Sequence, residues 1–351
     1  MNRMLRSAED LVAAGLIAGT EADALATVLA RYAVSVTPDM AELIEPDAPD
    51  DPIARQFIPT VQESLTKPEE RADPIGDAAH APVAGIVHRY PDRVLLKPLH
   101  VCPVYCRFCF RREMVGPNGL GTLTDAELEA AFAYIAGDPR IWEVVLTGGD
   151  PFALSTRRLG VIAERLAGID HVRVMRVHTR VPVVKPDLVS AGLVEALRRF
   201  GGAVFVALHA NHPREFTPAA RAACARLVEA GIPMVSQSVL LRGVNDDAAT
   251  LEALMRAFVE NRIKPYYLHQ GDLAPGTGHL RTGLAEGQDL MRRLRGRLSG
   301  LAQPTYVLDI PGGHGKVPVG PGYLRETQDG TRVTDPNGCE HPYPPRQDGE
   351  S

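Results

Sequence analysis

The chain of 351 residues carries a formal net charge of −5 and is 45% hydrophobic and 23% charged. This balance is typical of a globular protein with one large domain or two small ones, and it argues against a nucleic-acid-binding platform, which would carry a basic surplus. Because no apolar run is long enough to span a bilayer and no signal-peptide pattern begins the chain, we expect a cytoplasmic protein without membrane or nucleic-acid partners.

Residues 1–80 are predicted to form an N-terminal helical extension. The segments 5–17 and 22–34 have the apolar spacing of helices, and a connector rich in Pro and Asp follows at 36–52. No residue type in this part suggests chemistry, so we expect it to cap the rest of the protein or to mediate self-association.

Residues 81–325 are predicted to form the main domain, and 326–351 a C-terminal tail. Short apolar runs alternate with helical patterns in the main domain, which is typical of repeated βα units around a parallel sheet. Because there are about six units, the predicted fold class is α/β with an incomplete TIM-type barrel, whose active site lies at the carboxyl ends of the strands. The predicted strands cover 93–99, 143–149, 173–179, 203–209, 233–239 and 264–269.

Polar residues lie at the carboxyl ends of several predicted strands, where an active site is expected in this fold. They include His178, His209 and His269. Gln237 lies near the end of another strand and is a candidate for binding a cofactor.

Cys102, Cys106 and Cys109 form a C-x3-C-x2-C cluster directly after the first predicted strand. Three soft thiolates suit zinc or an iron–sulfur cluster, but no second pair of cysteines completes a zinc site, and buried thiols are the third alternative. With Phe108 just before the third cysteine, the spacing resembles the radical S-adenosylmethionine superfamily. That resemblance implies a [4Fe–4S] cluster on the three cysteines, with S-adenosylmethionine bound to the fourth iron. Cys224 is expected to be a core residue, and Cys339 is unassigned.

Gly148, Gly149 and Asp150 follow the next strand. Glycines in this position often mark only a tight turn. In the superfamily, however, a similar motif contacts the amino group of the methionine moiety, which makes these three residues candidates for binding S-adenosylmethionine.

Lys316 lies in the glycine-rich stretch PGGHGKVP at 311–318. The stretch does not match a P-loop, because Val317 follows the lysine and no helix pattern comes next. A lysine in such a loop can form a Schiff base with an aldehyde cofactor, or it can be an ordinary solvated side chain.

Several motifs in order, from VHRYPDRVLL at 87–96 to DIPGGHGKVP at 309–318, resemble the lysine 2,3-aminomutase family over about residues 73–325. The resemblance implies that Lys316 forms the Schiff base with pyridoxal 5′-phosphate. It also implies that Arg89 and Arg93 hold this cofactor, including its phosphate, although both could be surface charges. Guanidinium groups suit the role because their fork matches phosphate oxygens.

The resemblance also implies a site for the substrate. Arg111 would pair with the substrate carboxylate, although it could simply compensate the charge of the cluster. Asp272 and Asp309 would bind the distal ammonium of lysine, since two carboxylates in a closed pocket stabilise a cation and penalise an acidic side chain. Their alternative roles are a loop cap and a turn residue.

The implied function is the interconversion of L-lysine and β-lysine, an isomerase reaction that needs an external electron donor such as flavodoxin or ferredoxin. The family resemblance also suggests a homo-oligomer. Structural zinc is not predicted, because the C-terminal part has only Cys339. The alternatives are an aminomutase that makes β-lysine for elongation factor P, one that acts on another amino acid, an iron–sulfur electron-transfer or sensor protein, and a zinc-binding module.

Overall fold

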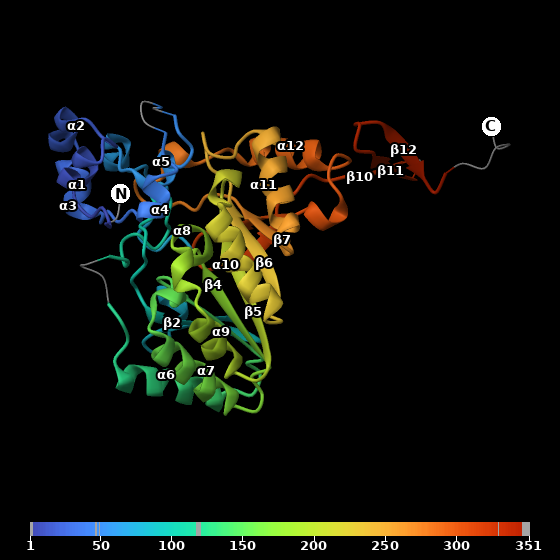
Figure 1. Cartoon of the computed structure of the whole chain (residues 1–351). Coiled ribbons are helices and arrows are strands. Elements are labelled where there is room, and N and C mark those ends of the chain that lie inside the picture. The colour runs from blue at the N-terminus through green and yellow to red at the C-terminus, as the bar shows by residue number, and fades with distance from the viewer. Residues whose placement is uncertain (1–2, 46–47, 49, 117–120, 329, 346–351) are drawn as a thin grey trace, which may run out of the picture.

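The computed structural model describes residues 3–45, 48, 50–116, 121–328 and 330–345. Its N-terminal part contains short helices joined by loops (Figure 1). Ser7 and Thr37 cap two of them by accepting hydrogen bonds from backbone amides in the first turn. The helices are α1 (Ala8–Ala13), α2 (Gly19–Ala24), α3 (Ala26–Arg31), α4 (Pro38–Ala41) and α5 (Ala54–Phe57), followed by the 3-10 turns η1 (Val61–Ser64) and η2 (Ala78–His80).

The N-terminal helices share one hydrophobic core with the rest of the protein. Leu11, Met40 and Phe57 are fully buried and belong to the same apolar cluster as the strand residues Leu96 and Leu146. The N-terminal part therefore contains helices that pack onto the barrel over a continuous apolar interface, while its predicted boundary at residue 80 stays a prediction.

The main domain is a nine-stranded sheet whose strands lie in sequence order. The seven strands β2 to β8 run parallel, and one antiparallel strand lies at each edge. The strands are β1 (Ile86–Tyr90), β2 (Arg93–Leu99), β3 (Glu143–Gly148), β4 (Val174–Thr179), β5 (Ala203–His209), β6 (Met234–Val239), β7 (Ile263–His269), β8 (Thr305–Asp309) and β9 (Lys316–Pro318).

Helices cover the outer face of the sheet (Figure 1). Thr124, Ser155, Ser190 and Thr217 each cap one of them with a side-chain oxygen, as expected where a loop enters a helix. The helices are α6 (Asp125–Gly137), α7 (Thr156–Ala167), α8 (Val181–Val184), α9 (Ala191–Arg198), α10 (Pro218–Glu229), α11 (Ala248–Glu260) and α12 (Leu284–Leu294), with 3-10 turns η3 (Pro151–Ala153), η4 (Pro186–Leu188), η5 (Pro213–Glu215), η6 (Gly278–Leu280) and η7 (Gly300–Ala302).

The sheet curls into an incomplete barrel, which confirms the predicted fold class. Within the described residues, no backbone pairing joins β1 to β9. Side chains and loops narrow the opening instead: the Tyr90 hydroxyl accepts a hydrogen bond from the Lys316 amide at 2.8 Å, and the Gly312 amide donates to the Pro74 carbonyl at 3.3 Å. The chain just before the barrel therefore lies against the loop that carries Lys316.

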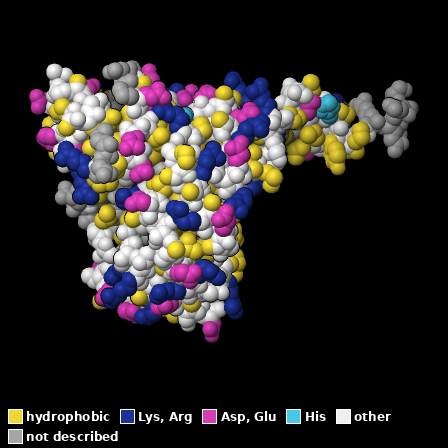
Figure 2. Space-filling view, viewed as in Figure 1, with side chains coloured by type: hydrophobic (Ala, Val, Ile, Leu, Met, Phe, Trp, Pro, Cys, Tyr) yellow, Lys and Arg dark blue, Asp and Glu magenta, His cyan; other side chains and the backbone are white. Residues whose placement is uncertain are grey.

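The six strands predicted from apolar runs are all present, with ends shifted by one residue at most. The sequence analysis did not predict the edge strands, nor a separate sheet formed by β10 (Leu324–Thr327), β11 (Gly330–Thr334) and β12 (Glu340–Tyr343) where mainly a tail was expected. These strands are short, β10 and β12 are mostly exposed and β11 is half-buried, so they lack the alternation of buried and exposed positions by which strands are recognised. The small sheet projects from the body and displays apolar side chains (Figure 2). In the described part of the chain, no helix has the length and apolar character needed to cross a membrane.

Candidate active site

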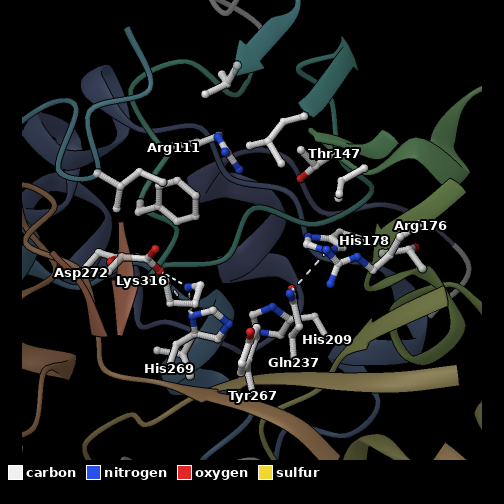
Figure 3. A pocket seen from close by; sticks show the side chains of 18 of the residues that line it. Arg111, Thr147, Arg176, His178, His209, Gln237, Tyr267, His269, Asp272 and Lys316 are labelled. Carbon is white, nitrogen blue, oxygen red and sulfur yellow. Dashed lines mark hydrogen bonds and ion pairs between the residues drawn. The ribbon is translucent and has the colours of Figure 1, made fainter. Parts of the chain in front are cut away.

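A cavity of about 650 Å³ lies inside the barrel and extends to the carboxyl ends of the strands. Its wall combines side chains from the strands with those of the cysteine loop after β2 (Figure 3). Of the predicted site residues, only Gly148 is outside this lining. The lining includes Arg89, Arg93, Cys102, Cys106, Phe108, Cys109, Arg111, Gly149, Asp150, Gln237, Asp272, Asp309 and Lys316.

The three cysteines have free thiols on one loop and face the same cavity. Burial, followed by repulsion from Cys106, raises the pKa of the Cys109 thiol to about 11. Among the described residues, no three His, Cys, Asp or Glu side chains converge closely enough to bind one metal ion. A four-iron cluster does not require such convergence, because each cysteine binds a different iron. Three soft donors on one loop fit that group.

Arg180 contacts this site and was not predicted as a functional residue. Its Nη1 atom donates to the Cys106 sulfur at 3.0 Å, and its Nη2 atom forms an ion pair with buried Glu215 at 2.8 Å. The sequence did contain a signal, because Arg180 directly follows a strand of the predicted barrel. A cation that donates to a cluster thiolate stabilises the negative charge on that sulfur.

The N-terminal extension holds the cysteine loop from the outside. The Arg107 side chain is only 2% exposed, and its Nε donates to Glu63 Oε1 at 2.9 Å. Arg112 forms a second ion pair with the Glu63 carboxylate. The Tyr105 amide also donates to the Ser35 carbonyl at 3.0 Å. The cysteines therefore lie on a loop whose shape depends on residues far away in the sequence.

The turn after β3 brings its own backbone close to the backbone at the start of the cysteine loop. Gly148 has a φ of +102°, which L side chains rarely adopt. A Cβ atom on Gly149 would lie 2.3 Å from the Val101 carbonyl oxygen. Glycine at both positions therefore lets β3 approach the start of the cysteine loop, and Gly148 acts through the backbone rather than by lining the cavity.

Asp150 ties the ends of β3 and β4 together. Its carboxylate accepts hydrogen bonds from the Thr179 hydroxyl and the Arg180 amide, both at 2.7 Å, and from the Phe152 amide at 3.0 Å. This structural role was not foreseen. A contact between Asp150 and S-adenosylmethionine stays a prediction.

Lys316, Asp309 and His269 form a contact group on one side of the cavity (Figure 3 labels Lys316 and His269). The Lys316 ammonium forms an ion pair with Asp309 and lies 3.1 Å from His269 Nδ1. Although burial disfavours the charge of Asp309, its hydrogen bond with His269 and its ion pair with Lys316 keep its pKa well below the usual range. Asp309 is therefore ionised at neutral pH, and Lys316 is held in the cavity.

Asp272 lies near this group and has the opposite shift. Burial, reinforced by the negative charge of Asp309, raises the pKa of Asp272 to about 7. Its neutral form would therefore be substantially populated at neutral pH until a cation binds beside it. A positively charged group beside them would favour the ionised form of both carboxyl groups, so the pair is suited to receiving a cation.

Arg111 and Arg89 meet at a third carboxylate, Asp77, which the sequence analysis did not identify. The Nε and Nη2 atoms of Arg111 donate to Asp77 Oδ2 at 3.0 and 2.8 Å, and Arg89 Nη2 lies 3.5 Å from Oδ1. Lys97 Nζ is 3.7 Å from the same carboxylate. The buried Nε of Arg89 has no hydrogen-bond partner. This surplus of cationic donors fits an anion such as a phosphate or a carboxylate.

Other lining residues add neutral and aromatic surfaces. His178 and His209 have pKa values far below normal because they are buried, so both are neutral. Phe108 stacks on His209 with ring centroids 5.5 Å apart, and Gln237 Nε2 lies 3.4 Å from His178 Nε2. The histidines could be expected from their places at strand ends, but their contacts could not.

Comparisons with known proteins agree with this arrangement. A family model described as the radical SAM superfamily matches residues 96–254, and one described as lysine-2,3-aminomutase matches residues 291–337. The L-lysine 2,3-aminomutase of Fusobacterium nucleatum is 38% identical over 320 residues, which cover 91% of this chain and 75% of that protein. The chain belongs to the lysine 2,3-aminomutase family.

This membership confirms the predicted family. It also confirms the predicted cofactors, which are a [4Fe–4S] cluster, S-adenosylmethionine and pyridoxal phosphate. The L-lysine 2,3-aminomutase of Clostridium subterminale is 38% identical, over 87% of this chain and 73% of that protein. The glutamate 2,3-aminomutase of Clostridioides difficile is 36% identical, over 84% of this chain and 68% of that protein. A radical SAM methyltransferase from Sphaerobacter thermophilus has a TM-score of 0.46 and 23% identity, over 64% of this chain and 68% of that chain.

Proposed function

We propose that this aminomutase acts on L-lysine and interconverts it with β-lysine. The observation that carries the proposal is that Asp272 and Asp309 line one cavity together with Lys316 and, on another wall, Arg111. An acidic side chain placed beside the two aspartates would suffer repulsion and lose its hydration. An ammonium group there would gain two carboxylate partners.

Each predicted residue has a role in this proposal. Cys102, Cys106 and Cys109 would hold the iron–sulfur cluster, and Gly148, Gly149 and Asp150 would form the turn beside S-adenosylmethionine, with Phe108 and Gln237 as further contacts. Arg89 and Arg93 would hold the phosphate of pyridoxal phosphate, and Lys316 would bind its aldehyde. When bound, these cofactors would supply radical chemistry at the substrate Cβ and a carrier for the migrating nitrogen.

The residues of the chain bind the substrate and exclude water. Arg111 would pair with the substrate carboxylate, while the two aspartates fix its distal ammonium. Fixing the substrate at both ends places its Cα and Cβ within the cavity and limits the paths open to a reactive radical. An external one-electron donor, such as flavodoxin or ferredoxin, would start the reaction.

The test is to incubate the anaerobically reconstituted protein with S-adenosylmethionine, pyridoxal phosphate, a strong reductant and either L-lysine or L-glutamate. We expect repeated turnover to β-lysine and none to β-glutamate, and Asp272→Asn and Asp309→Asn should each lose lysine turnover. Cleavage of S-adenosylmethionine without conversion of lysine would show that the substrate assignment is wrong.

The part played by Lys316 is tested separately by spectroscopy. The wild-type protein mixed with pyridoxal phosphate should show the absorbance band of an imine that Lys316→Ala lacks, because Lys316 provides the amine that lines the cavity. An unchanged band in Lys316→Ala would contradict the assignment and would favour an iron–sulfur protein without an aldehyde cofactor.

A further inference from the structure

We infer that Asp77 is a positioning residue for amino acid recognition: it holds one edge of the Arg111 guanidinium so that the other edge faces the substrate carboxylate. This inference rests on the proposed function, because it takes Arg111 as the group that binds that carboxylate. Asp77 itself lies in the segment before the barrel, and it does not line the cavity.

The geometry of the contact leaves one part of Arg111 free. The Nε and Nη2 atoms both donate to Asp77 Oδ2, so this edge of the guanidinium is occupied. The Phe110 ring lies 4.3 Å from the guanidinium carbon and restrains its plane. Figure 3 shows Arg111 directed into the cavity, on another wall from Lys316 and Asp272. The edge formed by Nη1 and the second N–H group of Nη2 is therefore left to donate to a ligand on the cavity side.

Asp77 is in turn fixed by its surroundings. Its side chain is 3% exposed, and its amide donates to Asp73 Oδ1 at 2.8 Å. Although burial opposes its charge, the neighbouring Arg111 and Lys97 lower the pKa of Asp77, so the carboxylate is ionised at neutral pH. A buried, ionised and anchored carboxylate is a rigid support for a flexible arginine.

If only charge mattered, removing the Asp77 carboxylate would strengthen binding of the substrate carboxylate, which is the opposite of what the positioning role predicts. Arg111, Arg89 and Lys97 surround it, so this group carries three positive charges against one negative charge. Neutralising Asp77 makes the wall more positive, which would strengthen attraction for an anion. If Asp77 acts by orienting Arg111, however, the same change weakens carboxylate binding because the guanidinium can rotate away. The two explanations therefore predict changes of opposite sign.

The test compares two ligands that differ only in the carboxylate. Protein saturated with pyridoxal phosphate, without S-adenosylmethionine or reductant, is titrated with L-lysine and with 1,5-diaminopentane, and the absorbance of the cofactor is followed. For Asp77→Asn we expect the apparent Kd of lysine to rise about tenfold, as for the loss of a charged hydrogen bond, while that of the diamine changes by less than about twofold. Cofactor content is measured in each sample because Arg89 also contacts Asp77.

Glu113→Gln is the matched control. Glu113 lies on the same loop as Arg111, but its carboxylate pairs with Arg31 and the Tyr32 hydroxyl instead of a residue that lines the cavity. The Glu113→Gln substitution should leave the apparent Kd values of lysine and of the diamine unchanged. If Asp77→Asn does not fold, Asp77→Glu displaces the guanidinium by one methylene and should produce the same selective loss.

Equal losses for both ligands would mean that Asp77 only supports the fold, and tighter lysine binding would mean that its charge matters more than its geometry; either result overturns the inference. If wild-type protein responds to neither ligand, the proposed lysine substrate is wrong. In that case L-glutamate and 4-aminobutyrate, which also differ by a carboxylate, replace the pair, and the same selective loss is required of Asp77→Asn.

Discussion

Asp272 and Asp309 are two carboxyl groups in one cavity, and their surroundings shift their pKa values in opposite directions. Asp309 is hydrogen-bonded to His269 and paired with Lys316, so its pKa is lowered. Burial and the negative charge of Asp309 disfavour the ionised form of Asp272, which raises its pKa to about 7. A substrate cation would stabilise the ionised form of Asp272 and bring its pKa down again.

This difference predicts a pH dependence of lysine binding. Below about pH 7, protonation of Asp272 must be reversed before an ammonium binds, so the lysine affinity should fall by up to about tenfold per pH unit. Above that pH the affinity should level off. Titrations between about pH 6 and pH 8, together with calorimetry in buffers of different ionisation enthalpy, should show release of a proton on binding. In Asp272→Asn, binding should be weak and its slope with pH should disappear.

At the scale of the single element, β3 and its turn connect the barrel to the cysteine loop. Gly148 ends β3 with a positive φ, and a Cβ atom there would lie 2.6 Å from the Leu99 carbonyl oxygen. The Gly149 amide donates to that same carbonyl at 2.7 Å. Because Leu99 ends β2, a displacement there is passed directly to the loop that follows it.

Gly148→Ala should therefore lower both stability and cluster content. We expect a loss of about 1–3 kcal/mol from the strained backbone and the clash with Leu99. Thermal unfolding and iron per chain after anaerobic reconstitution measure the two effects. Gly201→Ala is the control: its φ is +72°, but nothing lies within 4 Å of the added Cβ, so it should lose about 1 kcal/mol and keep its iron. Equal iron loss in both variants would contradict a link between this turn and the loop.

At the scale of the whole molecule, the N-terminal extension and the barrel are joined by buried charges as well as by apolar packing. The Glu63 carboxylate is fully buried and binds Arg107 and Arg112, which flank Cys109 in the sequence. Glu70 similarly accepts from the Gly276 amide and from Arg281, on the loop that carries Asp272. The extension thus contacts two separate walls of the cavity from the outside.

Glu63→Gln should be strongly destabilising because it leaves two buried guanidinium groups without their carboxylate. A loss of about 3–5 kcal/mol is typical when one partner of a buried ion pair is removed. Denaturant unfolding measures it. Glu113→Gln breaks a more exposed pair with Arg31, whose side chain is 48% exposed, so it should lose less than about 1 kcal/mol. Similar losses in the two variants would show that the buried network contributes little.

The sequence alone determined the features whose evidence is local. Apolar runs at regular spacing predicted the strands β2 to β7, because a buried strand must be apolar over its own length. The spacing of Cys102, Cys106 and Cys109 predicted a cluster because three ligands on one loop are recognisable without the fold. Motifs in a fixed order predicted the family. The exposed sheet β10 to β12 carries no such local signal, and the sequence analysis missed it.

Only the tertiary structure decided which charges meet. Asp77 and Arg111 are 34 residues apart and Glu63 and Arg107 are 44 apart, and no pattern in the sequence pairs them. The opposite pKa shifts of Asp272 and Asp309 likewise follow from burial and from neighbours on other strands. Local spacing fixes which groups a short segment can offer, whereas the energy of a charge depends on everything folded around it.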